Sequence, residues 1–204
     1  MKRGIIIFQK NAELGKVKTR LAAIVGDHRA LEIYKILINF THRQIQPVIA
    51  KKLVYFSNYI ESEFRENDSQ VQFFIQSSGN LGDKMCNAFL DQFEKGYDKL
   101  LIIGTDCPEI NSEIIEKAFD ELDQSEVVIG PAMDGGYYLL GMNRFIPGIF
   151  KNIRWSSDQV LKSTQDFLKL NEIKHSLLPV LSDVDHIEDW ERLKDKLTQT
   201  KEIN

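Results

Sequence analysis

Acidic residues that could bind a divalent cation follow two apolar stretches of this sequence. Asp106 comes directly after Leu-Leu-Ile-Ile-Gly-Thr at 100–105, and Pro108 restricts the turn that follows. A hard cation bound to phosphates needs only one or two carboxylates, because water and phosphate oxygens complete its coordination shell. We therefore predict Asp106 as a metal ligand, with Glu109 as a weaker candidate. The alternative is that Asp106 caps a turn or the helix that begins near Ile110.

A second acidic cluster is Asp-Val-Asp-His-Ile-Glu-Asp at 183–189. Asp183, Asp185 or His186 could supply a further metal ligand. A helix N-cap followed by an acidic first turn would also explain Asp185 and Glu188. The residues alone leave both interpretations open.

Basic residues surround a glycine just after the first apolar stretch, residues 4–8. They are Lys10, Lys16, Lys18 and Arg20, placed around Gly15. Glycine lets backbone amides approach closely, and a helix N-terminus favours anions, so we predict a site for a di- or triphosphate. This is not a Walker A loop, because Lys10 and Val17 stand where that pattern needs Gly and Ser or Thr. A solvated basic loop is the alternative, and Arg20 could instead brace the loop through Glu13.

The run Met-Asp-Gly-Gly-Tyr-Tyr at 133–138 combines paired glycines with paired tyrosines. Gly135 and Gly136 permit a tight backbone approach, and we expect them to leave room for a sugar ring. Asp134 could then face a sugar hydroxyl or an attacking nucleophile. If the chain is extended, Tyr137 and Tyr138 point to opposite faces, so one of them, Tyr137, is predicted to line the site. The alternative is a plain hairpin turn.

The elements that must position these residues alternate along the chain. Apolar runs predict strands at 4–8, 52–57, 70–76, 99–103, 126–130, 136–142 and 176–181. Helical stripes fill the gaps at 19–42 with a break at Gly26-Asp27, at 81–93, at 110–122, at 160–168 after a Ser156/Ser157 cap, and at 187–197. This order predicts one α/β domain over residues 1–204, with a mainly parallel sheet and helices on both faces. Ligands bind at the carboxyl edge of such sheets, where all the candidate loops fall.

Composition excludes several classes of function. The formal net charge is −4, so no nucleic-acid partner is expected. No apolar run approaches the roughly 20 residues of a membrane span. The two cysteines, Cys86 and Cys107, form no CxxC motif or disulfide framework, which favours a reduced, cytoplasmic location. Asp106 would raise the pKa of the neighbouring thiol, so Cys107 is not predicted to be a nucleophile.

The order of these motifs resembles one family. They are K-x-x-x-x-G-x-V-K-T-R-L from Lys10, N-L-G-D-K-M at 80–85, G-T-D-C-P at 104–108, G-P-A-M-D-G-G-Y-Y-L-L-G at 130–141, W-S-S at 155–157 and D-V-D-x-x-E-D at 183–189. The chain is similar to the bacterial family of candidate glycosyltransferases associated with radical-SAM and selenoprotein-domain genes, also called the arsenosugar-biosynthesis glycosyltransferase family. That family belongs to the GT-A superfamily of nucleotide-diphospho-sugar transferases.

The resemblance implies a Rossmann-like GT-A fold that binds a nucleotide diphosphate with Mg²⁺ or Mn²⁺. It implies Asp106 as the metal aspartate, Asp185 as a second ligand, and Gly82 against the base or ribose. The chain departs from the family pattern in three ways. Asn11-Ala12-Glu13-Leu14 stands where prolines are usual, His186 replaces a Thr, and 104–108 holds one acid rather than a DxD pair.

Three functions follow from the resemblance and the residues. A glycosyltransferase would take a nucleotide-sugar donor and a small-molecule acceptor, with Asp134 orienting or deprotonating the acceptor. A nucleotidyltransferase, similar to the molybdenum-cofactor guanylyltransferases, would use a nucleoside triphosphate and release pyrophosphate. A nucleotide-binding protein without catalysis is the third. We predict the first, and neither the base, the sugar nor the oligomeric state has a sequence signal.

Overall fold

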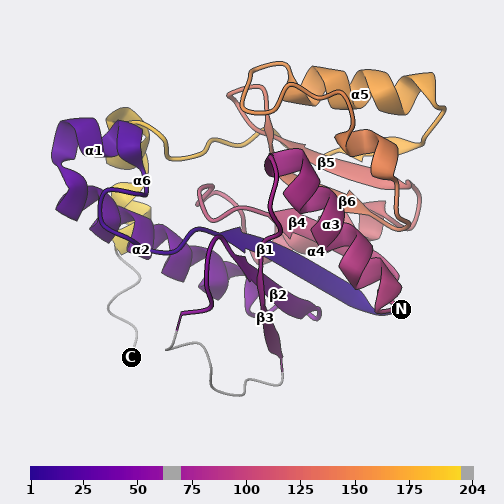
Figure 1. Ribbon diagram of the computed structural model, residues 1–204, viewed down its shortest axis with the longest axis horizontal. Coiled ribbons are helices and arrows are strands. Elements are labelled where there is room, and N and C mark those ends of the chain that lie inside the picture. Colours follow the sequence, from indigo (N-terminus) through magenta and orange to yellow (C-terminus); the bar gives the residue numbers. More distant parts are fainter. Residues whose placement is uncertain (62–69, 199–204) are drawn as a thin grey trace.

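A single seven-stranded sheet runs through the computed structural model, which describes residues 1–61 and 70–198 (Figure 1). The strands are β1 (Arg3–Gln9), β2 (Lys51–Phe56), β3 (Val71–Ile75), β4 (Lys99–Ile103), β5 (Val127–Pro131), β6 (Tyr137–Met142) and β7 (His175–Leu177). Their spatial order is β3-β2-β1-β4-β6-β5-β7. Only β6 runs antiparallel to its neighbours. The predicted α/β fold with a mainly parallel sheet is therefore confirmed. The predicted domain, 1–204, includes 62–69 and 199–204, which lie outside the described residues.

Helices cover both faces of this sheet. They are α1 (Thr19–Val25), α2 (Asp27–Ile45), α3 (Leu81–Glu94), α4 (Ser112–Glu121), α5 (Val160–Leu170), α6 (Ile187–Thr198) and the 3₁₀ helix η2 (Pro147–Phe150). One core cluster joins a face of the sheet to α4 and the end of α2, and a second joins the other face to α3, α5 and η2. Within residues 1–61 and 70–198, every helix is too short or too polar to cross a membrane.

Apart from Lys99 at the start of β4, the strands β4 and β5 are apolar, because both of their faces are covered. All five residues of β4 and all five of β5 are buried. The sequences of strands that are buried on both faces are continuous apolar runs, without alternation between apolar and polar residues. The runs at 99–103 and 126–130 therefore predicted these strands to within one residue.

A third, smaller cluster lies beyond the carboxyl edge of the sheet. It joins α1, α2 and α6, with Leu21, Leu37 and Trp190 among its buried members. Figure 1 shows α1 and α6 side by side at the left of the molecule, and the two helices are in contact. This packing brings the segment before α6 next to the basic loop before α1, although more than 160 residues separate them in the sequence.

Several predicted boundaries are wrong. The helix predicted to end at 42 continues to Ile45, and three other differences have a clear local reason. The strand predicted at 176–181 ends at Leu177, because Pro179 has no N–H to donate, and Leu181 forms only an isolated bridge. The helix predicted from Ile110 begins at Ser112, because the Asn111 side chain caps it. The predicted Ser156/Ser157 cap of α5 is absent: residue 159 is the N-cap, without a side-chain bond.

Candidate active site

The predicted loops meet around one cavity at the carboxyl edge of the sheet. Its volume is about 630 Å³. The predicted site residues that line it are Lys10, Lys18, Arg20, Asp106, Asp134, Gly136, Tyr137 and Asp185. A neighbouring cavity of about 400 Å³ has a more apolar wall, which includes Phe8, Met85 and Ile102. Lys10, Asp106 and Tyr137 line both cavities, so the two form adjoining compartments.

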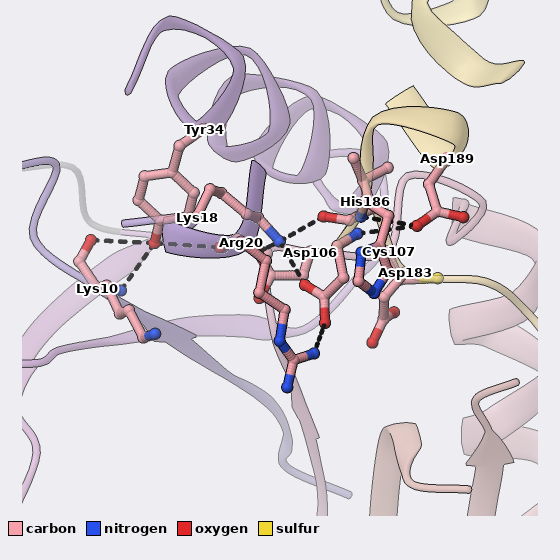
Figure 2. A network of polar contacts seen from close by, with 12 residues as sticks. Lys10, Lys18, Arg20, Tyr34, Asp106, Cys107, Asp183, His186 and Asp189 are labelled. Carbon is pink, nitrogen blue, oxygen red and sulfur yellow. Dashed lines mark hydrogen bonds and ion pairs between the residues drawn. The ribbon is translucent and has the colours of Figure 1, made fainter. Parts of the chain in front are cut away.

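Lys18 pairs with two aspartates, Asp106 and Asp185, in the lining of the larger cavity, and Figure 2 shows Lys18 beside Asp106. The Lys18 ammonium lies 2.7 Å from Asp106 Oδ1 and 3.2 Å from Asp185 Oδ1, and it donates to Val184 O at 2.7 Å. Burial alone would lower the pKa of Lys18, but the charges and hydrogen bonds of the two aspartates outweigh it and raise that pKa above its ordinary value. The predicted phosphate-binding lysine therefore pairs with both predicted metal ligands.

Asp183 lies in the same group and is partly buried. Burial first, and then the charges of Asp106 and Asp134, raise the pKa of Asp183 to about 7. Its Oδ1 atom is buried and has no hydrogen-bond partner among the described residues. A buried carboxylate oxygen without a partner is costly, and such atoms are typical of sites that bind an ion or water.

The segment 182–185 is held against the loop after β4 by three contacts. Val184 N donates to Asp106 O at 2.9 Å, and Ser182 N donates to Glu109 Oε2 at 2.7 Å. The Cys107 thiol donates to Ser182 O at 3.5 Å. Glu109, the weaker metal candidate, thus binds the backbone of this segment instead. Burial, followed by the charge of Asp183, raises the pKa of Cys107, which agrees with its predicted lack of nucleophilicity.

The N-terminus of α6 explains the rest of the second acidic cluster. Asp189 Oδ2 accepts from Asp185 N at 3.2 Å and from His186 N at 2.9 Å. Asp189, and not Asp185, therefore caps the helix, whereas Glu188 lies in an acidic first turn as predicted. The Asp185 side chain is left to face Lys18 and Arg20.

The basic loop divides into residues that reach the cavity and residues that do not. Arg20 Nη1 lies 3.4 Å from Asp185 Oδ2, so the carboxylate beside it is Asp185 and not Glu13, which was the alternative. Glu13 pairs with Lys16 instead. Gly15 lies outside the lining and has a φ of 73°, which only glycine adopts easily. Its role in the structure is to make the turn.

Tyr34 is a cavity residue that the sequence did not reveal. Its hydroxyl accepts from Lys10 N at 2.9 Å and donates to Lys10 O at 3.1 Å, and Thr105 Oγ1 donates to it at 3.4 Å. Tyr34 therefore links the loop after β1 to the loop after β4 (Figure 2). Its position on α2 follows the spacing of buried apolar residues, which made it indistinguishable from a core residue.

The hairpin between β5 and β6 carries Asp134 into the cavity. Asp134 Oδ1 accepts from Gly136 N at 2.9 Å, which is an Asx turn. A Cβ on Gly135 would lie 2.3 Å from Asp158 O, so this glycine permits packing of the hairpin against the segment before α5. Gly136 lines the cavity, but Gly135 does not. The motif therefore forms a hairpin turn, and Asp134 and Gly136 of that turn line the cavity.

The paired tyrosines point to opposite faces of the sheet, as predicted. Tyr138 packs in one core cluster, and its hydroxyl donates to Pro179 O at 3.0 Å. Tyr137 packs against the other cluster and meets the Trp155 ring edge-on, with centroids 6.5 Å apart. Burial raises the pKa of Tyr137, and its hydroxyl is enclosed, so the ring rather than the hydroxyl faces the cavity.

Gly82 makes room for Trp155. A Cβ at position 82 would lie 2.2 Å from Trp155 Nε1. Gly82 lies outside the lining of both cavities, whereas Leu81 lines both and Trp155 lines the larger one. In this structure the glycine positions an aromatic wall of the site, rather than lying against the predicted base or ribose itself.

Gly82→Ala is expected to destabilise the protein by about 1–3 kcal/mol, because the indole must move to admit the methyl group. Alanine is the better helix former, so without this contact the change would stabilise α3. Thermal unfolding measures the loss, and Trp155 fluorescence should shift as well. Gly104→Ala is the control, since its nearest atom would be 4.0 Å away. An unchanged melting temperature in Gly82→Ala would contradict the assignment.

No group of three or more His, Cys, Asp or Glu side chains forms a complete metal site in the part of the chain that the structure describes. The acids around Lys18 are therefore not a preformed cage. Any metal here must share its coordination shell with a ligand or with water.

Comparisons with known proteins agree with this architecture. The model of the family described as "Uncharacterized protein conserved in bacteria (DUF2064)" matches residues 41–157. Among curated proteins, none matches the sequence. A crystal structure of a candidate nucleotide-diphospho-sugar transferase from Desulfovibrio desulfuricans G20 is 29% identical, with a TM-score of 0.88, and the match covers 98% of this chain and 90% of that one.

More distant structures share the fold. One is a CMP:2-keto-3-deoxy-manno-octonic acid synthetase in complex with CTP, 12% identical with a TM-score of 0.60, covering 98% of this chain and all (100%) of that one. Another is Rv0371C of Mycobacterium tuberculosis H37Rv in complex with manganese, 11% identical with a TM-score of 0.57, covering 96% of this chain and 99% of that one. The fold is that of nucleotide-using transferases, as the sequence predicted.

Proposed function

This chain belongs to the DUF2064 family, and we propose that it is a metal-dependent glycosyltransferase that uses a nucleotide-sugar donor and a small-molecule acceptor. Residues 1–204 act as one nucleotide-diphospho-sugar transferase domain in this proposal. The similarity to the candidate transferase from Desulfovibrio desulfuricans supports a nucleotide-using transferase. The narrower link to arsenosugar biosynthesis and radical-SAM genes stays a prediction from the motifs.

The observation that carries the proposal is the composition of the larger cavity. Its wall combines the cations Lys10, Lys18 and Arg20 with the acids Asp106 and Asp134. Cations at a strand's carboxyl edge suit the two phosphates of a donor. Asp134, on the hairpin, stands where a second substrate could meet the donor. The adjoining, more apolar cavity is suited to a nucleoside.

The donor set of the cavity fits a divalent cation that is held partly by phosphate. Asp106 and Asp185 supply carboxylate oxygens, and their side chains are 44% and 41% exposed. Asp183 adds a buried oxygen without a partner. One or two carboxylates are enough when phosphate oxygens complete the shell, and Mg²⁺ or Mn²⁺ suits such oxygen ligands. When bound, the cation would neutralise charge on the diphosphate leaving group.

The proposed transfer breaks the bond between the anomeric carbon and the β-phosphate oxygen. The acceptor hydroxyl oxygen forms the new bond to that carbon, and its proton passes to Asp134. Lys18 and Arg20 would balance the charge that develops on the departing nucleoside diphosphate. Gly136 and the Tyr137 ring border the space for the sugar. These roles follow from position and chemistry, and the product assay below tests them.

Nucleotidyl transfer is the second candidate, and the number of cations favours it. Four basic side chains, Lys10, Lys16, Lys18 and Arg20, line one cavity, and such a group also suits the β- and γ-phosphates of a triphosphate. The bond broken would then join the α-phosphorus to the bridging oxygen, and pyrophosphate would leave. The two reactions share the site but differ in product.

A product assay separates them. We expect the protein to release nucleoside diphosphate from one member of a panel of nucleotide-sugars when Mn²⁺ is present. Without an acceptor, water should still hydrolyse that donor slowly and release the same diphosphate. If the protein instead releases pyrophosphate from a nucleoside triphosphate in the presence of a sugar phosphate, the reaction is nucleotidyl transfer and the proposed glycosyl transfer is wrong. Binding without either product would favour the third possibility, a nucleotide-binding protein without catalysis.

A further inference from the structure

The Lys18 ammonium already occupies a cation site built from oxygen atoms. Three oxygens surround it: Asp106 Oδ1, Val184 O and Asp185 Oδ1, at 2.7, 2.7 and 3.2 Å. The ammonium donates hydrogen bonds to Val184 O and Asp185 Oδ1 and forms an ion pair with Asp106. The side chain is 5% exposed, which leaves it no alternative partner in water.

The backbone of Lys18 also shows that this placement is imposed by its surroundings. Lys18 has a φ of 48°, in the left-handed region, at the residue that precedes α1. A non-glycine residue keeps such a conformation only where neighbouring contacts hold it, and such residues gather at functional sites. The ion pairs with two separate loops are contacts of that kind.

Two of the three oxygens belong to the carboxylates that the proposed function assigns to a divalent cation. A divalent cation on these carboxylates would lie within a few ångströms of the Lys18 ammonium, and because like charges repel, each cation weakens the binding of the other. Arg20 is a lesser competitor, because its side chain is 71% exposed and 3.4 Å from Asp185. The position of the Lys18 ammonium therefore determines whether the carboxylates of Asp106 and Asp185 are available to a metal ion.

We propose that Lys18 is a resident counter-cation that competes with the divalent cation for the carboxylates of Asp106 and Asp185. The inference rests on the proposed function. It makes metal binding weak in the protein alone. A bound diphosphate would offer the ammonium new oxygens, so that metal and nucleotide would bind together rather than in sequence.

The test is a calorimetric titration of Mn²⁺ into the protein without nucleotide. Lys18→Met removes the charge while filling the same buried space, and we expect it to bind Mn²⁺ at least about tenfold more tightly than the wild type. Lys16→Met is the matched control, because Lys16 lines the same cavity but pairs with Glu13. It should bind Mn²⁺ as the wild type does.

Lys18→Gln repeats the measurement if Lys18→Met does not fold, with the same expected gain. Equal or weaker Mn²⁺ binding after loss of the Lys18 charge, including no binding in either protein, would overturn the inference. A gain of similar size in Lys16→Met would do so too, because the effect would then be one of general charge. The titration contains no nucleotide and measures no turnover, so its failure is distinct from a failed product assay.

Discussion

Asp106→Asn is expected to weaken Mn²⁺-dependent binding of a nucleoside diphosphate by about 100-fold, while the fold is retained. The change removes one negative charge from the cavity and leaves the side-chain shape almost unchanged. A contact with a charged group contributes about 1.5–3 kcal/mol, and the upper end of this range corresponds to a factor of this size. Calorimetry with Mn²⁺ and with Mn²⁺ omitted separates the metal-dependent part of the affinity.

The chain offers a close control for this variant elsewhere in the sheet. Lys99 is 6% exposed and lies 2.6 Å from Asp123 Oδ1, and its ammonium also donates to Phe119 O. This pair resembles Lys18 and Asp106 in burial and geometry but lies outside the two cavities at the carboxyl edge. Asp123→Asn should cost stability without changing nucleotide affinity. If Asp106→Asn and the wild type bind the nucleotide equally tightly, Asp106 is not a ligand of the metal or the nucleotide.

Much of the fold could be predicted because its strands are buried on both faces. The runs at 4–8 and 99–103 contain nothing but apolar residues between their ends, and such runs have few alternatives in an α/β chain. The errors arose where one residue decides a boundary. Pro179 cannot join a ladder, and the Asn111 side chain sets the start of α4. Effects of this kind are local and do not alter the periodic pattern on which the prediction rests.

The edge that carries the site was predictable, but several roles within it were not. The strand order places Asp106, Asp134 and Asp185 together, and each follows an apolar run. The family resemblance placed Gly82 against a base or ribose, and the paired glycines suggested that Gly135 leaves room for a sugar. In the structure, a side chain at Gly82 would clash with Trp155, and one at Gly135 would clash with Asp158. Such contacts join segments that are distant in the chain, so no local pattern encodes them.

Asp134→Asn is expected to reduce the rate of sugar transfer by about 10²–10³-fold, with little change in the affinity for the bare nucleoside diphosphate. Loss of a general base costs a factor of this size. The variant is conservative in structure, because an asparagine Oδ1 can still accept from Gly136 N and keep the Asx turn. Single-turnover kinetics with a saturating donor measure the chemical step apart from binding.

Asp158→Asn is the matched comparison, since Asp158 is an exposed acid on the wall of the same cavity and lies beside the hairpin. Its Oδ1 atom accepts a hydrogen bond from the neighbouring Gln159 side chain, which lies outside the proposed reaction, so loss of its charge should change the transfer rate much less. If Asp158→Asn loses much of the transfer rate and Asp134→Asn loses little, then Asp158 and not Asp134 is the general base for the acceptor. A loss of donor affinity in Asp134→Asn, with the transfer rate at saturation unchanged, would instead make Asp134 a binding residue, because the bound donor would still react normally.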